Sequence, residues 1–262
     1  MQPDYELALE TSSRRGSVAL GHGGQTRAAR VLSAERTHTA ELLPAIRDLL
    51  AEVGAGPRDV GCVCFSQGPG SFTGLRVAAT VARMWQSALG CRVVAVPSLE
   101  VIARNALAYA GGPPHVAVLL DARRGRVFGG VFTCAATSPN AELQMNETVA
   151  AGLHDAATWL PTLPKPCSVL GDGVAAHRAT LDALGLQMLP EDYWLPDARE
   201  VLALGHQLAL AGHFCTPEQI VPLYLQPPEC EEVYEQRRAA ARARVGRNPK
   251  SKIARGRDPR CA

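Results

Sequence analysis

The chain has 262 residues, of which 47% are hydrophobic and 20% charged, and its formal net charge is +2. This composition excludes a wholly disordered or low-complexity protein, and the length suits one large domain or two smaller ones. The charge is unevenly distributed, because residues 235–262 hold ten basic and two acidic residues, a net charge of +8, and the first 234 residues therefore carry −6. The sequence predicts an acidic folded body followed by a basic, disordered tail.

The N-terminus has neither the basic start nor the apolar run of a secretory signal. No stretch approaches the roughly 18 apolar residues that a membrane helix needs. We therefore expect a cytoplasmic protein without membrane contact. Cys62 and Cys64 alternate along a predicted strand, so they share a face but are poorly placed to bond each other, and we predict that most of the eight cysteines are buried free thiols.

Strands and helices follow one another regularly through the first half of the sequence. Apolar runs bounded by turn residues indicate the strands, and apolar residues at helical spacing indicate the helices. In chain order the predicted elements are strands at residues 7–10, 17–20 and 26–31, a helix at 39–53, a strand at 60–66, a helix at 75–89, a strand at 92–96 and a helix at 98–110.

The second half repeats the opening of this pattern. An apolar strand at residues 116–121 ends in Asp121, and a turn and a strand at 127–133 follow. Beyond residue 137 the pattern is weaker, with a strand at 168–170 and helices at 174–184 and 198–211. We predict an α/β fold with two related lobes, residues 1–110 and 111–234, of which the second is reduced, and a separate tail at 235–262.

The first strand ends in an acid, Glu10, and continues into Thr11, Ser12 and Ser13. In actin-like, sugar-kinase and Hsp70-type ATPases such a strand end holds hydrated Mg²⁺ while the hairpin bonds phosphate oxygens. Asp121 with Arg123 repeats this layout. The alternative is an acid that only solvates a turn, because many strands end in this way.

A glycine-rich loop precedes the long helix, and its residues are Gln67, Gly68, Pro69, Gly70, Ser71, Phe72, Thr73 and Gly74. The free amides and positive dipole end of a helix N-terminus favour an anion, so Gly70, Ser71 and Gly74 are candidate phosphate ligands. The loop lacks the lysine of a Walker motif. The alternative is a tight strand-to-helix turn whose glycines permit close packing.

The helix at residues 75–89 is apolar on most sides. One apolar row contains Val77, Val81, Met84 and Ala88, a second contains Leu75, Ala78, Ala82 and Leu89, and a narrow polar stripe contains Arg76, Thr80, Arg83 and Ser87. One row can face the sheet, and the other needs cover from the preceding helix or from a partner protein. Full burial within one large domain is the alternative. Ala78 and Ala82 would allow close helix–helix approach in either case.

Motifs for independent catalysis are missing. None of the seven histidines forms a His-x-x-x-His pair, and no Gly-x-Ser-x-Gly elbow occurs. We find no nucleophile–base pair and predict no catalytic residue and no metal site.

Several of these segments together closely resemble the bacterial TsaB (YeaZ) family. They are residues 7–12, His38 and Thr39 with residues 42–44, residues 68–76 above all, residues 121–123, and residues 222–225. The resemblance implies an actin-like ATPase fold (ASKHA, RNase H-like) that has lost catalysis and requires no cofactor of its own. It also implies a scaffold that partners TsaD, the enzyme that transfers threonylcarbamoyl to adenosine 37 of tRNA, with the ATPase TsaE joining the assembly.

Members of that family pair with TsaD, or with themselves, through their first two helices, and ATP or ADP is a candidate ligand of that interface. The resemblance therefore marks Leu42, Ile46, Leu49, Arg76, Thr80 and Arg83 as interface residues, beside the small Ala78 and Ala82. It also makes Glu10, Thr11, Ser12, Gly70, Ser71 and Gly74 a vestigial phosphate site.

Two features depart from the family pattern. The family usually has aspartate where this chain has Glu10, and the longer side chain would displace a bound cation. The basic tail is not part of the pattern, and we expect it either to contact tRNA or to be a solvated segment. The alternative functions are an ATPase or phosphotransferase that uses Glu10 and the loop from Gly68 to Gly74, and an RNA-binding module that depends on the tail.

Overall fold

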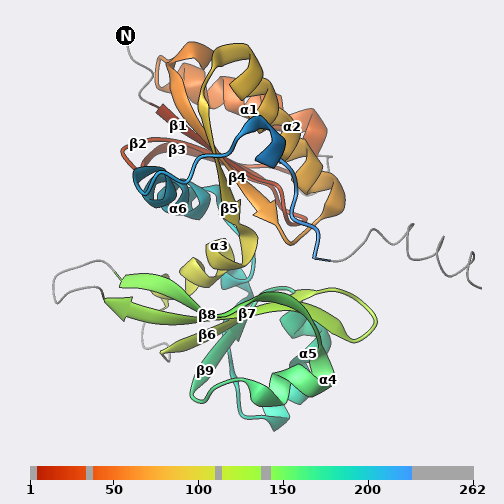
Figure 1. Ribbon diagram of the computed structural model, residues 1–262. Coiled ribbons are helices and arrows are strands. Elements are labelled where there is room, and N and C mark those ends of the chain that lie inside the picture. The colour runs from red at the N-terminus through yellow and green to blue at the C-terminus, as the bar shows by residue number, and fades with distance from the viewer. Residues whose placement is uncertain (1–4, 34–37, 110–113, 137–142, 226–262) are drawn as a thin grey trace, which may run out of the picture. The chain divides into compact units, whose positions relative to one another are not determined.

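The computed structural model describes residues 5–33, 38–109, 114–136 and 143–225. Contacts within the chain join residues 1–225 into one compact unit built around two five-stranded mixed sheets (Figure 1). The predicted basic tail, residues 235–262, lies outside the described residues.

The first sheet has the strand order β3-β2-β1-β4-β5. Its strands are β1 (Tyr5–Glu10), β2 (Ser17–His22), β3 (Gln25–Val31), β4 (Val60–Gly68) and β5 (Arg92–Pro97). The short turns after β1 and β2 make those pairs antiparallel, whereas the helical connections to β4 and β5 make their pairs parallel. All five strands occur where the sequence predicts them.

Helices cover both faces of the first sheet (Figure 1). On one face, α1 (His38–Glu52) and α2 (Phe72–Leu89) share a core with Leu7, Leu9 and Phe65. On the other face, α6 (Ala198–Leu210) packs on Ala8, Cys64 and Val94. Helix α2 begins three residues before the predicted start, because the Ser71 hydroxyl accepts a hydrogen bond from the Gly74 amide and caps it.

The second sheet repeats the topology of the first, in the order β10-β9-β6-β7-β8. Its strands are β6 (His115–Asp121), β7 (Arg126–Ala136), β8 (Leu143–Asp155), β9 (Cys167–Leu170) and β10 (Gln187–Met188), with α4 (Ala156–Trp159) after β8 and α5 (Gly173–Ala183) between β9 and β10. The pairs β6–β7 and β7–β8 are antiparallel, like the hairpins of the first sheet. The pairs β6–β9 and β9–β10 are parallel. This repetition confirms the prediction of an α/β fold with two related lobes.

Sequence reasoning missed strand β8. It is an edge strand, and residues 146–150 along it are exposed, so it lacks the alternation of buried and exposed residues that marks a half-buried strand. Its long pairing with β7 holds it in the sheet instead.

The helices that follow the two sheets are exchanged between them. Helix α3 (Ser98–Arg104) follows the first sheet but contributes Leu99 and Ile102 to the core of the second. Helix α6 follows the second sheet but packs on the first. The apolar face of α6, a helix of the predicted lobe at residues 111–234, is thus buried by strands from residues 8–96. The boundary at residue 110 stays a prediction.

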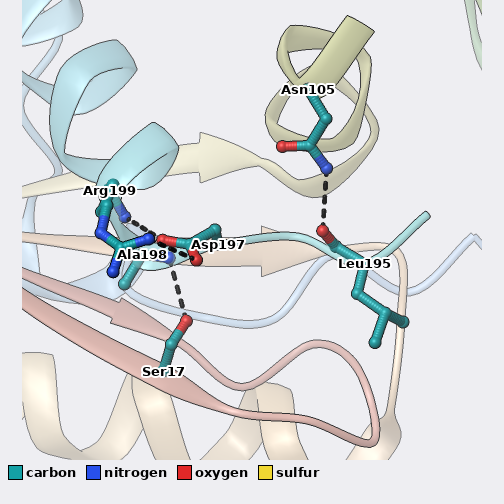
Figure 2. A network of polar contacts seen from close by, with 6 residues as sticks. All are labelled: Ser17, Asn105, Leu195, Asp197, Ala198 and Arg199. Atoms are coloured by element: carbon teal, nitrogen blue, oxygen red, sulfur yellow. Dashed lines mark hydrogen bonds and ion pairs between the residues drawn. The ribbon is translucent and has the colours of Figure 1, made fainter. Parts of the chain in front are cut away.

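The chain enters α6 through a segment that polar contacts fix in place (Figure 2). The Asn105 side-chain amide donates to the carbonyls of Tyr193, at 2.9 Å, and Leu195, at 2.8 Å. The buried Ser17 hydroxyl on β2 then accepts a hydrogen bond of 2.9 Å from the Ala198 amide. Asn105 also begins a 3₁₀ turn, so helix α3 is shorter than the predicted 98–110.

The described cysteines are free thiols, as predicted for most of the eight. Cys62, Cys64, Cys91 and Cys167 are buried, and Cys134 and Cys215 are half-buried. Burial raises the pKa of Cys91 to about 11 and that of Cys167 to about 12, so both remain unreactive thiols near neutral pH.

Candidate functional site

The Glu10 carboxylate is fully buried, and its bonds stay within the protein. One oxygen accepts hydrogen bonds of 2.6 Å from both the amide and the hydroxyl of Ser12, and the other accepts from the Ser66 hydroxyl on β4. Burial raises the pKa of Glu10, and its serine bonds only partly oppose that effect. Both oxygens are thus used to join the β1–β2 turn to β4, and neither is presented to a metal ion.

The glycine-rich loop packs backbone to backbone against the same turn. A Cβ atom on Gly74 would lie 1.8 Å from the Thr11 carbonyl oxygen, and one on Gly70 would lie 2.3 Å from the Ser12 carbonyl oxygen. The Thr11 hydroxyl donates to the Gly74 carbonyl at 2.7 Å, and the Ser71 amide donates to the Ser12 carbonyl at 2.6 Å. The glycines therefore serve close packing, which was the alternative interpretation of this loop.

A cleft of about 480 Å³ opens beside these two turns. Of the six predicted phosphate residues, Ser12, Gly70 and Ser71 line it, whereas Glu10, Thr11 and Gly74 do not. The other cleft-lining residues are Ser13, Arg14, Phe72, Thr73, Ile102, Leu120, Asp121, Arg123, Phe128, Asp172, Trp194, Leu195 and Pro196. The cleft is lined by both polar and apolar residues, and Glu10, the first acid expected to hold a cation, is not among them.

Asp121, the expected counterpart of Glu10, is exposed at this cleft beside Asp172. The Asp172 carboxylate accepts a hydrogen bond of 3.0 Å from the Asp121 amide, and Asp121 accepts one of 2.8 Å from the Arg123 amide. Burial raises the pKa of Asp172, and the neighbouring Asp121 raises it further. Sequence reasoning missed Asp172, although it stands between two glycines directly after a strand. Within the described part of the chain, no cluster of His, Cys, Asp or Glu could hold a metal ion.

Five residues of the predicted partner interface lie in the core between the helices and the first sheet. Leu42 and Ile46 are 1% and 3% exposed, and Leu49, Ala78 and Ala82 are each 0% exposed. The last three cannot touch a docked protein. The expectation that small residues at 78 and 82 let a partner helix approach is wrong, because that row of α2 faces the chain's own sheet.

The remaining apolar row of α2 faces a groove that it forms with α1. Two adjoining hollows of about 450 and 440 Å³ share Leu43 and Met84, whose exposed fractions are 48% and 46%. We call this surface the α1/α2 groove, and its lining residues are Leu42, Leu43, Ile46, Arg47, Leu50, Ala51, Ala55, Pro57, Phe72, Thr73, Arg76, Val77, Thr80, Val81, Met84, Trp85, Ala88 and Leu89. Leu42, Ile46, Arg76 and Thr80 of the predicted interface are among them.

The arginines of the polar stripe are engaged within the chain. Arg83 donates to the Ile220 carbonyl at 2.9 Å, and Arg76 donates to the Tyr224 hydroxyl at 3.0 Å. Arg83 therefore faces the C-terminal segment rather than the groove. Leu43 and Met84 are exposed large apolar residues of the groove that the prediction missed, although Met84 belongs to an apolar row recognisable on a helical wheel.

Comparison with known proteins identifies the class to which this fold belongs. Residues 32–234 match the family model for TsaD, tRNA N6-adenosine threonylcarbamoyltransferase, so the chain belongs to the class of two-lobed actin-like proteins that includes this transferase. A Nitrosospira multiformis protein named tRNA N6-adenosine threonylcarbamoyltransferase is 34% identical over 110 residues, which are 36% of this chain and 32% of that protein.

Relatives that match over a greater share of the chain identify the family within this class. The tRNA threonylcarbamoyladenosine biosynthesis protein TsaB of Haemophilus influenzae is 30% identical over 84% of this chain and 92% of its own length, and the Bacillus subtilis protein of that name is 31% identical over 68% and 76%. The structure of YeaZ from Pseudomonas aeruginosa superimposes with a TM-score of 0.68 at 28% identity, covering 85% of this chain and all of that one. The chain belongs to the TsaB (YeaZ) family, as the sequence resemblance predicts.

Among the described residues no helix is both long and apolar enough to cross a membrane.

Replacing Gly74 with alanine tests the close packing of the two turns. The added methyl group would overlap the Thr11 carbonyl, so we expect the Gly74→Ala variant to lose about 1–3 kcal/mol of unfolding free energy in urea denaturation, or to fail to fold. Gly56→Ala is the matched control, because a Cβ atom there would meet its nearest neighbour at 3.8 Å, and its stability should be unchanged. Equal stabilities of the two variants would contradict the packing argument.

The buried Glu10 predicts a pH-dependent stability. Its pKa is raised in the folded protein, so its contribution is fully present below the ordinary value of 4.5 and is lost as the pH rises through the folded value. In Glu10→Gln, a neutral isostere replaces the carboxylate, and the fall in unfolding free energy above pH 4.5 should be smaller than in the wild type. Parallel stability curves for the two proteins, from denaturation at a series of pH values, would contradict this.

Proposed function

We propose that this chain is a non-catalytic scaffold that supports threonylcarbamoylation of adenosine 37 in tRNA by docking onto the threonylcarbamoyltransferase TsaD. The observation that carries the proposal is the α1/α2 groove, an apolar surface that exposes about half of the Leu43 and Met84 side chains. Clustered exposed apolar residues of this kind are typical of protein-binding surfaces.

The internal bonding of Glu10 supports the absence of independent catalysis. Glu10 is fully buried, does not line the cleft and accepts three hydrogen bonds from Ser12 and Ser66, and its burial favours the protonated form. We propose that this chain requires no cofactor of its own. We expect ATP or ADP, if used, to bind together with the partner.

We propose TsaD as the partner because the two proteins are related in fold and because the groove is apolar. The chain belongs to the same class as the transferase, and two related folds can offer each other the same pair of helices, as in a pseudo-symmetric dimer. When the partner is absent, we expect the isolated chain to form a homodimer through the same groove. TsaE is expected to join the assembly, on the basis of the family resemblance.

A charge placed in the groove tests the docking. We expect Leu43→Asp to weaken the heterodimer with TsaD from the same organism by at least about tenfold, because the carboxylate would be buried in an apolar interface. Size-exclusion chromatography with light scattering, on each protein alone and on the mixture, measures the pairing. Leu43 is half exposed in the free protein, so the fold should be unaffected.

Leu210→Asp is the matched control, because Leu210 is 76% exposed at the end of α6, on the opposite face of the first sheet. It should pair like the wild type. Separate peaks for the wild-type proteins at micromolar concentrations, with ATP and TsaE present, would refute the scaffold proposal.

The alternative of an ATPase or phosphotransferase is not favoured. It requires Glu10 to bind a cation and the loop from Gly68 to Gly74 to cradle phosphate, whereas the structure directs Glu10 inward and fills the loop with the Thr11 and Ser12 backbone. Nucleotide turnover by the isolated chain that disappears in Glu10→Gln would reinstate this alternative.

We further propose that the basic tail adds contacts to tRNA. Its ten basic residues suit sequence-independent phosphate binding, which weakens as the salt concentration rises, because the release of counterions from the nucleic acid then gains less free energy. Truncation after Tyr234 should weaken tRNA binding by the assembly and flatten its dependence on salt. A tail of the same length with its basic residues changed to glutamine should behave like the truncation, and unchanged binding in both would refute the proposal.

A further inference from the structure

The last described residues form a strap along helix α2. We define the C-terminal strap as residues 215–224. It begins where the Cys215 amide donates to the Val93 carbonyl on β5 at 2.8 Å. The Gln86 side chain then donates to the Cys215 carbonyl at 3.3 Å, and Arg83 donates to the Ile220 carbonyl at 2.9 Å. The polar stripe of α2 thus binds the strap backbone.

Two further bonds hold the strap at the end of β4. The Leu223 amide donates to the Gln67 carbonyl at 2.8 Å, and the Gln67 side chain donates to the Val221 carbonyl at 3.2 Å. The Leu223 carbonyl oxygen lies 2.6 Å from where a Cβ atom of Gly68 would stand, so the strap lies directly on the chain at this point. Its backbone is held at both ends and in the middle.

The strap ends in a cluster of three side chains at the start of α2. The Tyr224 ring lies 5.1 Å from the Phe72 ring, centroid to centroid, and the Arg76 guanidinium carbon lies 3.8 Å above the same Phe72 ring. Arg76 also donates to the Tyr224 hydroxyl at 3.0 Å. Each of the three side chains restrains the other two, which fixes the direction of an exposed arginine.

This cluster makes the strap continuous with the α1/α2 groove. Phe72 and Arg76 line one of the two hollows of the groove. On the strap itself, Val221, Leu223 and Tyr224 are 43%, 39% and 40% exposed. The apolar surface therefore extends past the helices onto a segment that is far from them in the sequence.

We infer that the C-terminal strap forms one wall of the partner-docking surface, with Leu223 in apolar contact and the Phe72–Arg76–Tyr224 cluster bonding a carboxylate of the partner. The inference rests on the proposed function, and its occupant is the TsaD subunit proposed there. Arginine and tyrosine dominate binding energies at interface centres, and a side chain held in place before binding loses less entropy when it binds. A stacked guanidinium keeps terminal donors in the geometry that suits a carboxylate.

Three aspartate substitutions test the contributions of the strap and of the groove to binding separately. Leu223→Asp probes the strap, Leu43→Asp probes the groove, and Leu210→Asp is the control on α6. We expect the first two to weaken TsaD binding at least about tenfold, measured by titration calorimetry, and the control to change it less than about twofold. Thermal unfolding of each variant alone verifies that the fold persists.

Tyr224→Ala provides a second test that leaves the strap backbone intact. It removes the ring contact and the hydroxyl that orients Arg76, and we expect it to weaken binding at least about fivefold and to reduce the salt dependence of the dissociation constant. Tyr224→Phe, which keeps the ring contact, should lose less affinity than Tyr224→Ala.

The outcomes distinguish the two proposals. If Leu43→Asp abolishes binding while Leu223→Asp and Tyr224→Ala bind like the wild type, the strap inference is overturned and the proposed function stands. If all variants bind normally, docking through the groove is overturned together with the strap. If the strap variants impair only self-association, the partner named here is wrong, and the inference fails.

Discussion

The start of helix α2 is fixed by a contact between two backbones that leaves no room for a side chain. The Thr11 carbonyl occupies the space beside Gly74, and the Ser12 carbonyl accepts the Ser71 amide. This contact joins the turn after β1 to the loop after β4, so it sets the position of α2 on the sheet. The groove with α1 and the positions of Phe72 and Arg76 depend on it.

The same contact uses groups that could bind phosphate for packing within the protein instead. A hairpin rich in hydroxyls and a glycine loop at a helix N-terminus are suited to phosphate. Here the Thr11 hydroxyl and the Glu10 carboxylate bond to the protein itself, and the loop glycines admit backbone rather than ligand. These groups stabilise α2, whose uncovered surface is the one that we propose for docking.

Exchange of the helices α3 and α6 ties the two sheets together. Each helix leaves its own sheet and completes the core of the other, and the Arg104–Glu200 ion pair of 2.8 Å joins the two helices directly. Helix α6 also leads the chain back to the first sheet. The strap consequently begins beside β5 and can reach α2, and the C-terminal residues become part of the same surface as the first two helices.

The sequence alone determined most of the local structure and the family. Apolar runs bounded by turn residues identified the first sheet and the core strands of the second, because strands that are covered on both faces are apolar along their length. Residues 68–76 carried the resemblance to the TsaB family. It could not identify β8, since pairing with β7 stabilises this exposed edge strand without a periodic signal.

The tertiary structure was needed to tell which residues of the candidate site are exposed and which of them meet. A helical wheel separates two apolar rows on α2 but cannot say which one the sheet covers, so Ala78 and Ala82 were assigned to the partner and Met84 was not. Only the folded chain decided that Glu10 turns inward, because one of its three hydrogen bonds comes from Ser66, 56 residues away. Only the folded chain brought Tyr224 to Arg76, since residues 148 positions apart meet through packing and not through any pattern along the sequence.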